Sequence, residues 1–281
     1  MITDFSGKVV VITGGASGIG YALGEQFGAA GAKVVIADVE DAPLKEAAAR
    51  LGATGVKTDV RQADSVQALA DSVIERFGRV DIVCNNAGVS VMAGVETLSP
   101  SDFRWVMDVN FFGVVHGVKS FLPHLKANPD GGWIVNTASL NGLVPLPALA
   151  AYGASKYAVV GFSEALRAEL QGEGDKVGVS VLCPGPVRTN IRYSARNRDQ
   201  GYGPSGRREG EPDMHEKAFR GTVSPDGFID AEEAAAAVLQ ALREGRFWAL
   251  TQPELMQPYE ARTREIGEAL EAAKAVQSGR T

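Results

Sequence analysis

The sequence predicts an α/β fold in which a doubly wound parallel sheet of about seven strands carries helices on both faces. Short β-branched runs alternate with longer helical patterns six or seven times along the 281 residues. Parallel strands need long crossover connections, and helical crossovers cover both faces of the sheet. No internal repeat, low-complexity block or linker divides the chain into two parts. We therefore expect residues 1–281 to form a single domain.

The part of the chain up to Gly78 has the clearest stop signals. The run KVVVIT at 8–13 predicts the first strand, and the helix expected over 18–30 ends at Gly31, a residue typical of helix C-termini. The next expected elements are, in order, a strand at 33–38, a helix at 43–51, a short strand near 54–58 and a helix at 62–77 that Gly78 ends.

The alternation continues beyond Gly78 and is interrupted once. β-branched runs predict strands at 80–86, 133–139, 177–183 and 247–250, and periodic or Ala-rich segments predict helices at 101–127, 150–172 and 230–244. The stretch 186–229 is rich in Gly, Pro and Arg, has weak periodicity, and is typical of a functional lid or a disordered segment. Residues 251–281 are expected to form a polar, helical tail.

The expected lid carries most of the unassigned positive charge. A carboxylate or phosphate on a substrate could bind its arginines, but we prefer the interpretation that they are solvated and balanced by nearby acidic residues. The arginines are Arg188, Arg192, Arg196, Arg198, Arg207 and Arg208, and the acidic residues are Asp199, Glu209, Glu211 and Asp213.

Composition excludes several classes of function. A net charge of −6 and a pI near 5.3 disfavour binding to nucleic acid or an anionic membrane. The N-terminal segment lacks the pattern of a signal peptide, and no apolar run is long enough to span a bilayer, so a cytoplasmic location is expected. Cys84 and Cys183 are expected to be free thiols. His116, His124 and His215 lack metal-ligand spacing, so no metal site is expected.

The segment TGGASGIG at 13–20 joins the first strand to the first helix. Glycines at 14, 18 and 20 allow a diphosphate to approach the backbone, and the helix N-terminus attracts its charge. Asp38, at the end of the second strand, is placed to accept hydrogen bonds from ribose hydroxyls and to repel a 2′-phosphate. This pattern favours NAD over NADP as cofactor. A ligand-free β–α turn and a solvated Asp38 are the alternatives.

A tyrosine and a lysine share one face of the helix expected at 150–172. Tyr152 and Lys156 are four residues apart, so their side chains point the same way. An ammonium close to a phenol is expected to lower the phenol pKa from about 10 toward neutrality, which would make Tyr152 a general acid and base. Tyr157 points elsewhere and is expected to serve packing or an interface.

Together these segments resemble the short-chain dehydrogenase/reductase family, whose members have a single Rossmann-type domain. The resemblance extends to about residue 190 and again over 230–250. It rests on six segments in the family's order: TGGASGIG at 13–20, Asp59-Val60, NNAG at 85–88, VMDVNFFG at 106–113, NTASLNG at 136–142 and CPGPVRT at 183–189, followed or accompanied by the Tyr152–Lys156 pair.

The resemblance implies roles for four catalytic residues. Tyr152 exchanges the proton of the substrate hydroxyl, Ser139 binds the substrate oxygen, and Lys156 holds the nicotinamide ribose and lowers the tyrosine pKa. Asn110 positions a water that connects Lys156 to solvent. From the residues alone, a strand-capping role for Ser139 and a role for Asn110 at a helix kink remain open.

The resemblance also implies an NAD site and a reaction. Its expected contacts are Gly14, Ser17, Gly18, Ile19, Gly20, Asp38, Asp59, Val60, Asn86, Ala87, Gly88, Tyr152, Lys156, Pro184, Gly185, Val187 and Thr189. We expect an NAD-dependent enzyme that interconverts a secondary alcohol and a ketone. The alternatives are a non-catalytic NAD(H)-binding sensor or scaffold and an NADPH-dependent 3-oxoacyl reductase.

Substrate and assembly follow from the apolar segments. Residues 89–94 and 140–152 follow strands, are largely apolar, and are expected to line the pocket for a hydrophobic alcohol or ketone. The helices at 101–127 and 150–172 are apolar on more than one side, as at Ala154, Ala158 and Phe162. Since the family often buries these helices between subunits, a homodimer or homotetramer is expected.

Overall fold

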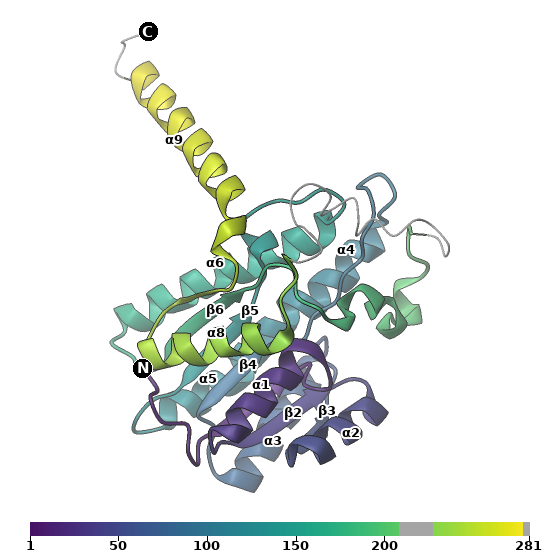
Figure 1. Ribbon diagram of the computed structural model, residues 1–281, viewed down its shortest axis with the longest axis vertical. Coiled ribbons are helices and arrows are strands. Elements are labelled where there is room, and N and C mark those ends of the chain that lie inside the picture. The colour runs from purple at the N-terminus through teal and green to yellow at the C-terminus, as the bar shows by residue number, and fades with distance from the viewer. Residues whose placement is uncertain (208–226, 278–281) are drawn as a thin grey trace.

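The structure is a computed structural model that describes residues 1–207 and 227–277. Within these ranges, seven strands form one parallel sheet in the order β3-β2-β1-β4-β5-β6-β7, which confirms the predicted doubly wound sheet (Figure 1). The strands are β1 (Val9–Thr13), β2 (Lys33–Asp38), β3 (Thr54–Lys57), β4 (Ile82–Asn85), β5 (Trp133–Thr137), β6 (Gly178–Cys183) and β7 (Trp248–Leu250).

One face of the sheet is covered by α1 (Gly18–Ala29), α2 (Asp41–Leu51) and α8 (Ala231–Glu244), which lie in front of the strands in Figure 1. Their apolar stripes pack on the β-branched residues that predicted the strands, and Phe27 and Leu23 of α1 are fully buried there. Burying a side chain of this size contributes about 2 kcal/mol. The apolar residues that recur with helical periodicity are therefore the ones that cover this face of the sheet.

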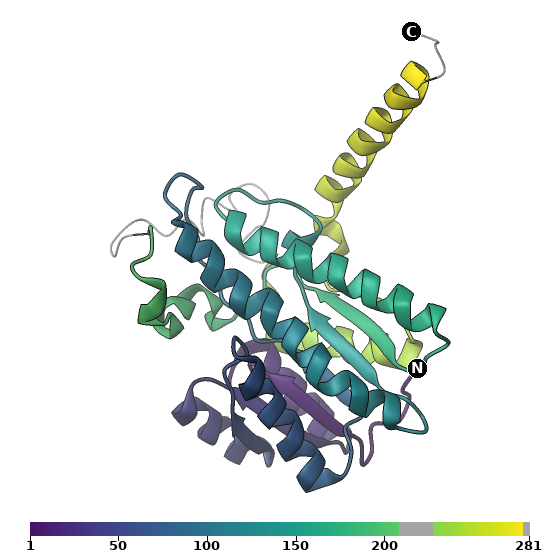
Figure 2. The same cartoon turned by 180° about the vertical axis from the view of Figure 1, so that it is seen from behind.

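The opposite face is covered by α3 (Ala63–Phe77), α4 (Pro100–Met107), α5 (Gly113–Ala127) and α6 (Ala150–Gly172), as Figure 2 shows from behind. The largest hydrophobic cluster lies under these helices, and Trp105 and Phe121 are completely buried in it. The ends of α4 and α3 follow local sequence signals. Ser99 and Asp102 form a capping box at the start of α4, and Gly78, with a φ of 72°, ends α3.

The helix expected at 101–127 contains a π-helical turn, η1 (Asp108–Phe112), between α4 and α5. Beyond this turn α5 lies close to the sheet. A Cβ at Gly113 would lie 2.9 Å from Cγ2 of Val60, and one at Gly117 would lie 1.9 Å from Oδ1 of Asn85. A π turn inserts one extra residue, which rotates the following helix, and such turns are frequent at functional sites.

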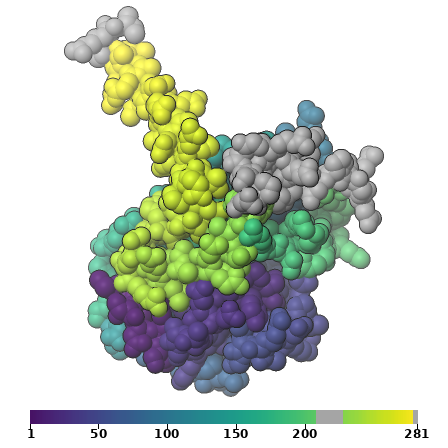
Figure 3. Space-filling view, in the orientation of Figure 1, coloured from purple at the N-terminus to yellow at the C-terminus, as the bar shows by residue number. Residues whose placement is uncertain are grey.

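The last described helix, α9 (Gln257–Gln277), extends away from the body of the molecule, as the yellow atoms in Figure 3 show. None of its described residues is buried, and Ile266, Leu270 and Val276 are more than half exposed. This confirms the expected helical tail over most of 251–281. Among the described helices, α9 included, none is long and apolar enough to cross a membrane.

The sheet topology determines where a ligand can bind. All paired strands are parallel, so their carboxyl ends lie at one edge of the sheet. From β1 the chain continues outward to β2 and β3, and it then crosses back to β4 on the other side of β1. The loops after β1 and β4 therefore separate at this edge and leave a crevice, the usual ligand position in open α/β sheets.

Candidate active site

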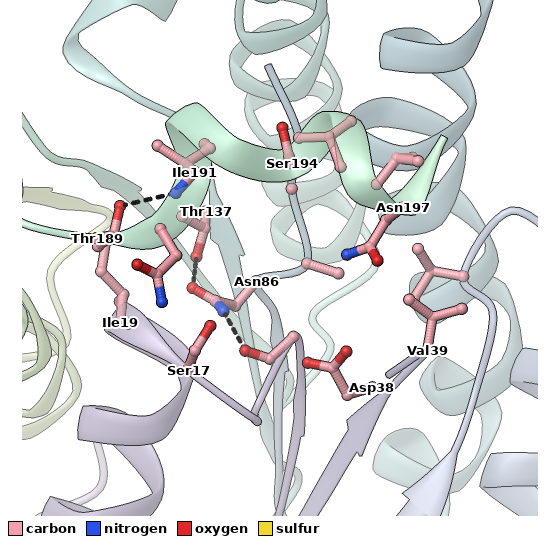
Figure 4. Close-up of a pocket in the computed structure, with 18 of the residues that line it drawn as sticks. Ser17, Ile19, Asp38, Val39, Asn86, Thr137, Thr189, Ile191, Ser194 and Asn197 are labelled. Atoms are coloured by element: carbon pink, nitrogen blue, oxygen red, sulfur yellow. Dashed lines mark hydrogen bonds between the residues drawn. The ribbon is translucent and has the colours of Figure 1, made fainter. Parts of the chain in front are cut away.

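A cleft, here called the main cleft, opens at the carboxyl edge of the sheet. Figure 4 shows Asp38 and Val39 at one side of it and Ile19 and Thr189 at the other. The expected cofactor contacts that line it are Gly14, Ser17, Gly18, Ile19, Asp38, Asp59, Val60, Asn86, Ala87, Gly88, Tyr152, Lys156, Pro184 and Thr189. Most of the expected cofactor contacts therefore lie around one cavity.

The glycine-rich turn after β1 fits tightly against the loop after β4. Gly14 has a φ of 66°, and a Cβ there would lie 2.8 Å from Cα of Ala87. A Cβ at Gly20 would lie 2.1 Å from the carbonyl oxygen of Gly14, so this glycine packs beneath the turn and does not line the main cleft. A larger side chain at either position would move the turn away from the cleft.

Asn86 connects the two loops. Its side-chain amide donates to the carbonyl oxygen of Thr13 at 3.0 Å, and its Oδ1 accepts from the Thr137 hydroxyl at 3.3 Å. Figure 4 shows the contact with Thr137, and the side-chain amide also makes a longer hydrogen bond, at 3.4 Å, to the carbonyl oxygen of Gly14. Asn86 therefore connects the carboxyl ends of β1 and β5 at the cleft, in addition to lining it.

The carboxylate of Asp38 lies at the end of β2 and accepts two main-chain hydrogen bonds. Ala16 and Glu40 donate their N–H groups to it, each at 3.1 Å. Burial raises the pKa of Asp38, and these two hydrogen bonds oppose that rise. The side chain is therefore fixed in orientation before any ligand hydroxyl approaches it.

The segment after β6 crosses the main cleft as the 3₁₀ helix η3 (Asn190–Asn197), seen with Ser194 and Asn197 in Figure 4. Arg196 on η3 forms a two-pronged ion pair with Glu40, at 2.6 and 2.9 Å. The arginine and the carboxylate lie beside Asp38. This contact joins the segment after β6 to the loop after β2.

The expectation that the lid arginines are solvated and balanced within the lid is wrong for Arg196 and Arg198. Glu40 binds Arg196, and Arg198 lies next to the buried Asp102, with Nη1 and Oδ1 2.9 Å apart but not aligned for a hydrogen bond. The Arg198 side chain is only 9% exposed, because it also stacks on Trp105. Arg208, Glu209, Glu211 and Asp213 lie outside the described residues.

Tyr152 and Lys156 lie on one face of α6, as predicted. Lys156 is 2% exposed, and its ammonium donates a 2.8 Å hydrogen bond to the carbonyl oxygen of Thr137 at the end of β5. The same nitrogen lies 5.6 Å from the centre of the Tyr152 ring. The ammonium therefore faces the ring of Tyr152 while the sheet edge holds it.

The expected lowering of the Tyr152 pKa is wrong in this structure. Burial among apolar side chains raises the pKa of Tyr152 to about 12, although interaction with the Ser139 hydroxyl lowers it. Burial also lowers the pKa of Lys156 to about 8. Loss of water destabilises both charged forms, and the contact of Lys156 with the ring does not compensate.

Ser139 follows β5 and begins the short 3₁₀ turn η2 (Leu140–Gly142). Its hydroxyl accepts from the main-chain N–H of Asn141 at 3.1 Å and donates to the carbonyl of Pro184 at 3.4 Å. Ser139 therefore caps this turn, and not the strand as the alternative interpretation had it. It also lines the pocket described below together with Tyr152.

Asn110 lies in the π-helical turn and is fully buried. Its side chain accepts from the N–H of Val89 at 2.8 Å and donates to the carbonyl of Val89 and to the Ser155 hydroxyl. Asn110 thus connects the loop after β4 to α6, which supports the interpretation that it binds at a helix irregularity. It lines neither of the two cavities, and its expected water stays a prediction.

A second cavity, here called the apolar pocket, adjoins the main cleft. The two cavities meet around Tyr152, because five residues line both of them: Ile19, Tyr152, Pro184, Thr189 and Ile191. The pocket is also lined by Ser90, Met92, Ser139, Leu140, Asn141, Val144, Leu146, Leu149, Gly185, Pro186, Val187, Phe228, Leu255 and Pro258. The segments 89–94 and 140–152 line it as expected, whereas Gly185 and Val187 face this pocket and not the main cleft.

Several residues at the site could not be identified from the local sequence around them. Glu40 and Arg196 were missed because they are 156 residues apart, and Thr137 was missed because its carbonyl oxygen, and not its side chain, binds Lys156. Leu255 and Pro258 belong to the expected tail, yet they reach the apolar pocket. The local signal for the ion pair between Glu40 and Arg196 was limited to the acidic character of Glu40, two residues after Asp38.

The cysteines and histidines lie apart from this chemistry. Cys84 and Cys183 are both buried, with β5 between their strands. His116 hydrogen-bonds the carbonyl oxygen of Val60 at 2.8 Å. Over residues 1–207 and 227–277, the structure contains no cluster of three metal-ligating side chains, and His215 lies outside these ranges.

Sequence comparison assigns the chain to a family. The profile of the short chain dehydrogenase family matches residues 8–200, more than half of the chain. The chain belongs to the short-chain dehydrogenase family. As the resemblance implied, it is an oxidoreductase.

Two relatives extend this short-chain dehydrogenase assignment to most of the chain. It is 31% identical to the CLA biosynthesis dehydrogenase/reductase of Lactiplantibacillus plantarum over 270 residues, 94% of either protein. It is 36% identical to the 1-deoxy-11-beta-hydroxypentalenate dehydrogenase of Streptomyces avermitilis over 256 residues, 87% of this chain and 84% of that one.

A solved structure is similar to this short-chain dehydrogenase throughout. It is a short chain dehydrogenase/reductase from Burkholderia phymatum, determined in complex with NAD. The TM-score is 0.86 at 37% sequence identity, and the match covers 96% of this chain and 97% of the other. The Rossmann-type fold of this chain is therefore shared with a protein that was solved with NAD bound.

Proposed function

We propose that this enzyme uses NAD to interconvert a secondary alcohol with a largely apolar body and the corresponding ketone. The observation that carries this proposal is that the main cleft and the apolar pocket meet at Tyr152. Lys156 lies on the main-cleft side of the tyrosine, and Ser139 lies on the pocket side. A proton-exchanging group thus stands where a cofactor and a substrate would touch.

The main cleft suits an extended dinucleotide. Gly14 and Gly18 allow close backbone approach for the diphosphate, and within the described residues no side chain caps the α1 N-terminus at Ser17, so its first amides keep free donors. Asp38 is placed for the ribose hydroxyls. We assign Asp59, Val60, Asn86, Ala87 and Gly88 to the adenosine half, and Pro184 and Thr189, which line both cavities, to the nicotinamide half. Gly185 and Val187 line only the apolar pocket, so we place them where the nicotinamide would meet the substrate.

The side chains perform the proton chemistry. When bound, NAD supplies the site that accepts or returns a hydride. At neutral pH Tyr152, with a pKa of about 12, holds its proton and can donate it to a ketone oxygen as the alcohol forms. In the oxidising direction the phenolate must take that proton, so the positive charge of Lys156 has to stabilise it. Ser139 hydrogen-bonds the substrate oxygen on which charge develops.

Preference for NAD over NADP rests on two carboxylates. Asp38 and Glu40 lie together at one side of the main cleft, and Arg196 is already paired with Glu40. A 2′-phosphate at this position would face Asp38 across a short distance and would have to compete for Arg196. Measuring kcat/KM for NAD and NADP checks this preference, and a higher value with NADP would overturn it.

Direct binding and turnover test the proposed reaction. Fluorescence titration with NADH should give a saturable Kd, and a panel of apolar secondary alcohols should then be oxidised faster than polyols. Tyr152→Phe should bind NADH as the native protein does, yet turn over none of the panel at a comparable rate. NADH binding without turnover of any alcohol or ketone would support the sensor instead.

We also propose an assembly and a lid. Ala154 is exposed on α6, Phe112 at the end of η1 is 43% exposed, and Ala158 and Phe162 are partly exposed, so α5 and α6 could form a subunit interface in a dimer or tetramer. Light scattering of the purified protein tests this, and a monomeric mass contradicts it. The lid proposal concerns 186–229, of which 208–226 lie outside the described residues.

A further inference from the structure

The apolar pocket contains a buried amide with an unused donor. Asn141 is 3% exposed, and its Oδ1 accepts a 3.1 Å hydrogen bond from the main-chain N–H of Leu146. This contact fixes which end of the amide is oxygen, because only oxygen can accept from an N–H. Among the described residues, Nδ2 of Asn141 has no hydrogen-bond partner. A buried donor without a partner is rare, and a ligand or a bound water molecule would supply the missing acceptor.

The unused donor lies next to the expected reaction centre. Asn141 is two residues after Ser139, and its main-chain N–H donates to the Ser139 hydroxyl at 3.1 Å. Its amide also lies against α6, where a Cβ at Gly153, the residue after Tyr152, would lie 3.5 Å from Nδ2. Two residues span at most about 7 Å of chain. Asn141 therefore lies close to Ser139 along the chain, and it lines the same pocket as Ser139 and Tyr152.

A second buried polar atom without a partner lines the same pocket. Ser90 is 6% exposed, and within the described chain its hydroxyl makes no hydrogen bond. Its main-chain N–H and carbonyl are both bound to the Ser194 hydroxyl, at 2.9 and 3.1 Å, so its backbone is fixed. Ser90 comes from the loop after β4 and Asn141 from the loop after β5. Most other lining residues are apolar.

We propose that the apolar pocket selects substrates with a second oxygen close to the reacting carbon, and that Nδ2 of Asn141 donates a hydrogen bond to it. This inference rests on the proposed function and narrows its substrate class to α- or β-oxygenated secondary alcohols and their ketones. The Ser90 hydroxyl provides a further polar contact for such a group. A site with a buried donor rejects an analogue that lacks the acceptor, because the donor is then left unpaired.

Paired substrates that differ in one carbonyl group test the proposal. 2-Hydroxy-1-phenylpropan-1-one carries a carbonyl where 1-phenylpropan-2-ol has a methylene group. Native kcat/KM should be about tenfold or more higher for the hydroxyketone. Asn141→Leu should reduce this ratio to near one. Asn141→Asp keeps an acceptor for Leu146 but loses the donor, so it should reduce the ratio without disturbing the loop.

A control variant separates selectivity from packing. Val144→Ala enlarges the same pocket without removing a donor and should change kcat/KM for both alcohols by a similar factor. A structural role for Asn141 would likewise lower both rates together and leave their ratio unchanged. Equal native rates for the two alcohols, or a ratio that survives both Asn141 variants, would overturn the proposal while the proposed function stands.

Binding without turnover gives an independent readout. Calorimetry on the NAD-loaded protein compares 1-phenylpropane-1,2-dione with 1-phenylpropan-2-one, neither of which can donate a hydride. The dione should bind about tenfold more tightly to the native protein and equally to Asn141→Asp. If this holds while neither alcohol is oxidised, the proposed function fails and the inference stands. Equal affinities, or binding of neither ketone, mean that water alone satisfies Asn141 and overturn the inference.

Discussion

The ammonium of Lys156 donates a hydrogen bond to the carbonyl oxygen of Thr137, which ties α6 to the carboxyl end of β5. One carbonyl replaces the several water molecules that an ammonium binds in solution, so burial lowers the pKa of Lys156 to about 8. The lysine is therefore charged at neutral pH by a narrow margin. Its protonation state then links the stability of the fold to the chemistry at Tyr152.

The first prediction concerns stability against pH. Between the folded pKa of about 8 and the ordinary value of 10.5, the unfolded chain binds more protons than the folded protein, so the free energy of unfolding rises with pH. Lys156→Met removes this gain. From pH 7 to 9.5, the native protein should gain about 2 kcal/mol relative to the variant, measured by urea denaturation.

Comparison with a second variant isolates the effect. Tyr152, with a raised pKa of about 12, lowers stability only above its ordinary value of 10.0, outside this window. Burial raises the pKa of Cys84 in both proteins alike, so its contribution cancels. The charge of Lys156 lowers the pKa of Cys183, so loss of that charge in Lys156→Met raises this thiol pKa further. Lys119→Met, at an exposed position, controls for loss of a surface charge. A constant difference between native protein and Lys156→Met contradicts the low lysine pKa.

The second prediction concerns the proton donor. Tyr152→Phe removes the phenol oxygen and should lower kcat by about a thousandfold, within the range for general acid–base catalysis. Ser139→Ala should also lower kcat, by roughly a hundredfold, because the substrate oxygen loses a donor. NADH affinity, measured by fluorescence, should stay within about twofold in both variants. Near-native turnover in Tyr152→Phe rules out the proton role.

The sequence predicted the local features of this molecule well. Gly78 ended its helix as expected, Asp38 stood at the end of β2, and the four-residue spacing placed Tyr152 and Lys156 on one helix face. These features depend on the periodicity and turn preferences of neighbouring residues. The alternation of strands and helices, together with the family resemblance, predicted the doubly wound parallel sheet.

Features that depend on distant contacts were not predicted. The π turn at Asp108–Phe112 arises where Asn110 binds Val89, 21 residues earlier, and no local pattern indicates it. Arg196 finds Glu40 across 156 residues. The pKa of Tyr152 was given the wrong direction because the spacing to Lys156 was visible, whereas the burial of the phenol was not.

The third prediction concerns the ion pair that anchors the segment after η3. Arg198→Met leaves the fully buried Asp102 without its cationic partner and should destabilise the protein by about 3 kcal/mol. Arg188→Met, at a position between β6 and η3, is the matched control. Its pair with Asp230 is more than half exposed on both sides, so its loss should cost less than about 1 kcal/mol. Thermal unfolding of both variants gives the comparison.

The pH dependence of this pair has a definite sign. Burial, the largest influence, raises the pKa of Asp102, but hydrogen bonds from Gly206 and Ser99 together outweigh it and the pKa is lowered. A lowered carboxyl pKa stabilises the fold above its ordinary value of 3.8, and this contribution is lost as pH falls through the folded pKa. The penalty of Arg198→Met should therefore be constant from pH 5 to 7. Equal stabilities of the two arginine variants in that range would contradict the buried pair.

The last prediction concerns cofactor selectivity, where Asp38 and Arg196 act in opposite directions. Asp38→Asn removes the charge that repels a 2′-phosphate. It keeps an oxygen for only one of the N–H groups of Ala16 and Glu40, because these bind different oxygens of the carboxylate. The ratio of kcat/KM for NADP to that for NAD should rise about tenfold. Arg196→Met leaves the carboxylate of Glu40 unpaired, which adds negative charge near Asp38, so the ratio of kcat/KM for NADP to that for NAD should fall. The variant also loses the contact between η3 and the loop after β2, so KM for NAD should rise a few fold. Arg192, which stacks on Tyr193 of the same helix, provides the control Arg192→Met, with little change expected. A ratio that moves the same way in Asp38→Asn and Arg196→Met would show that these charges do not set the preference.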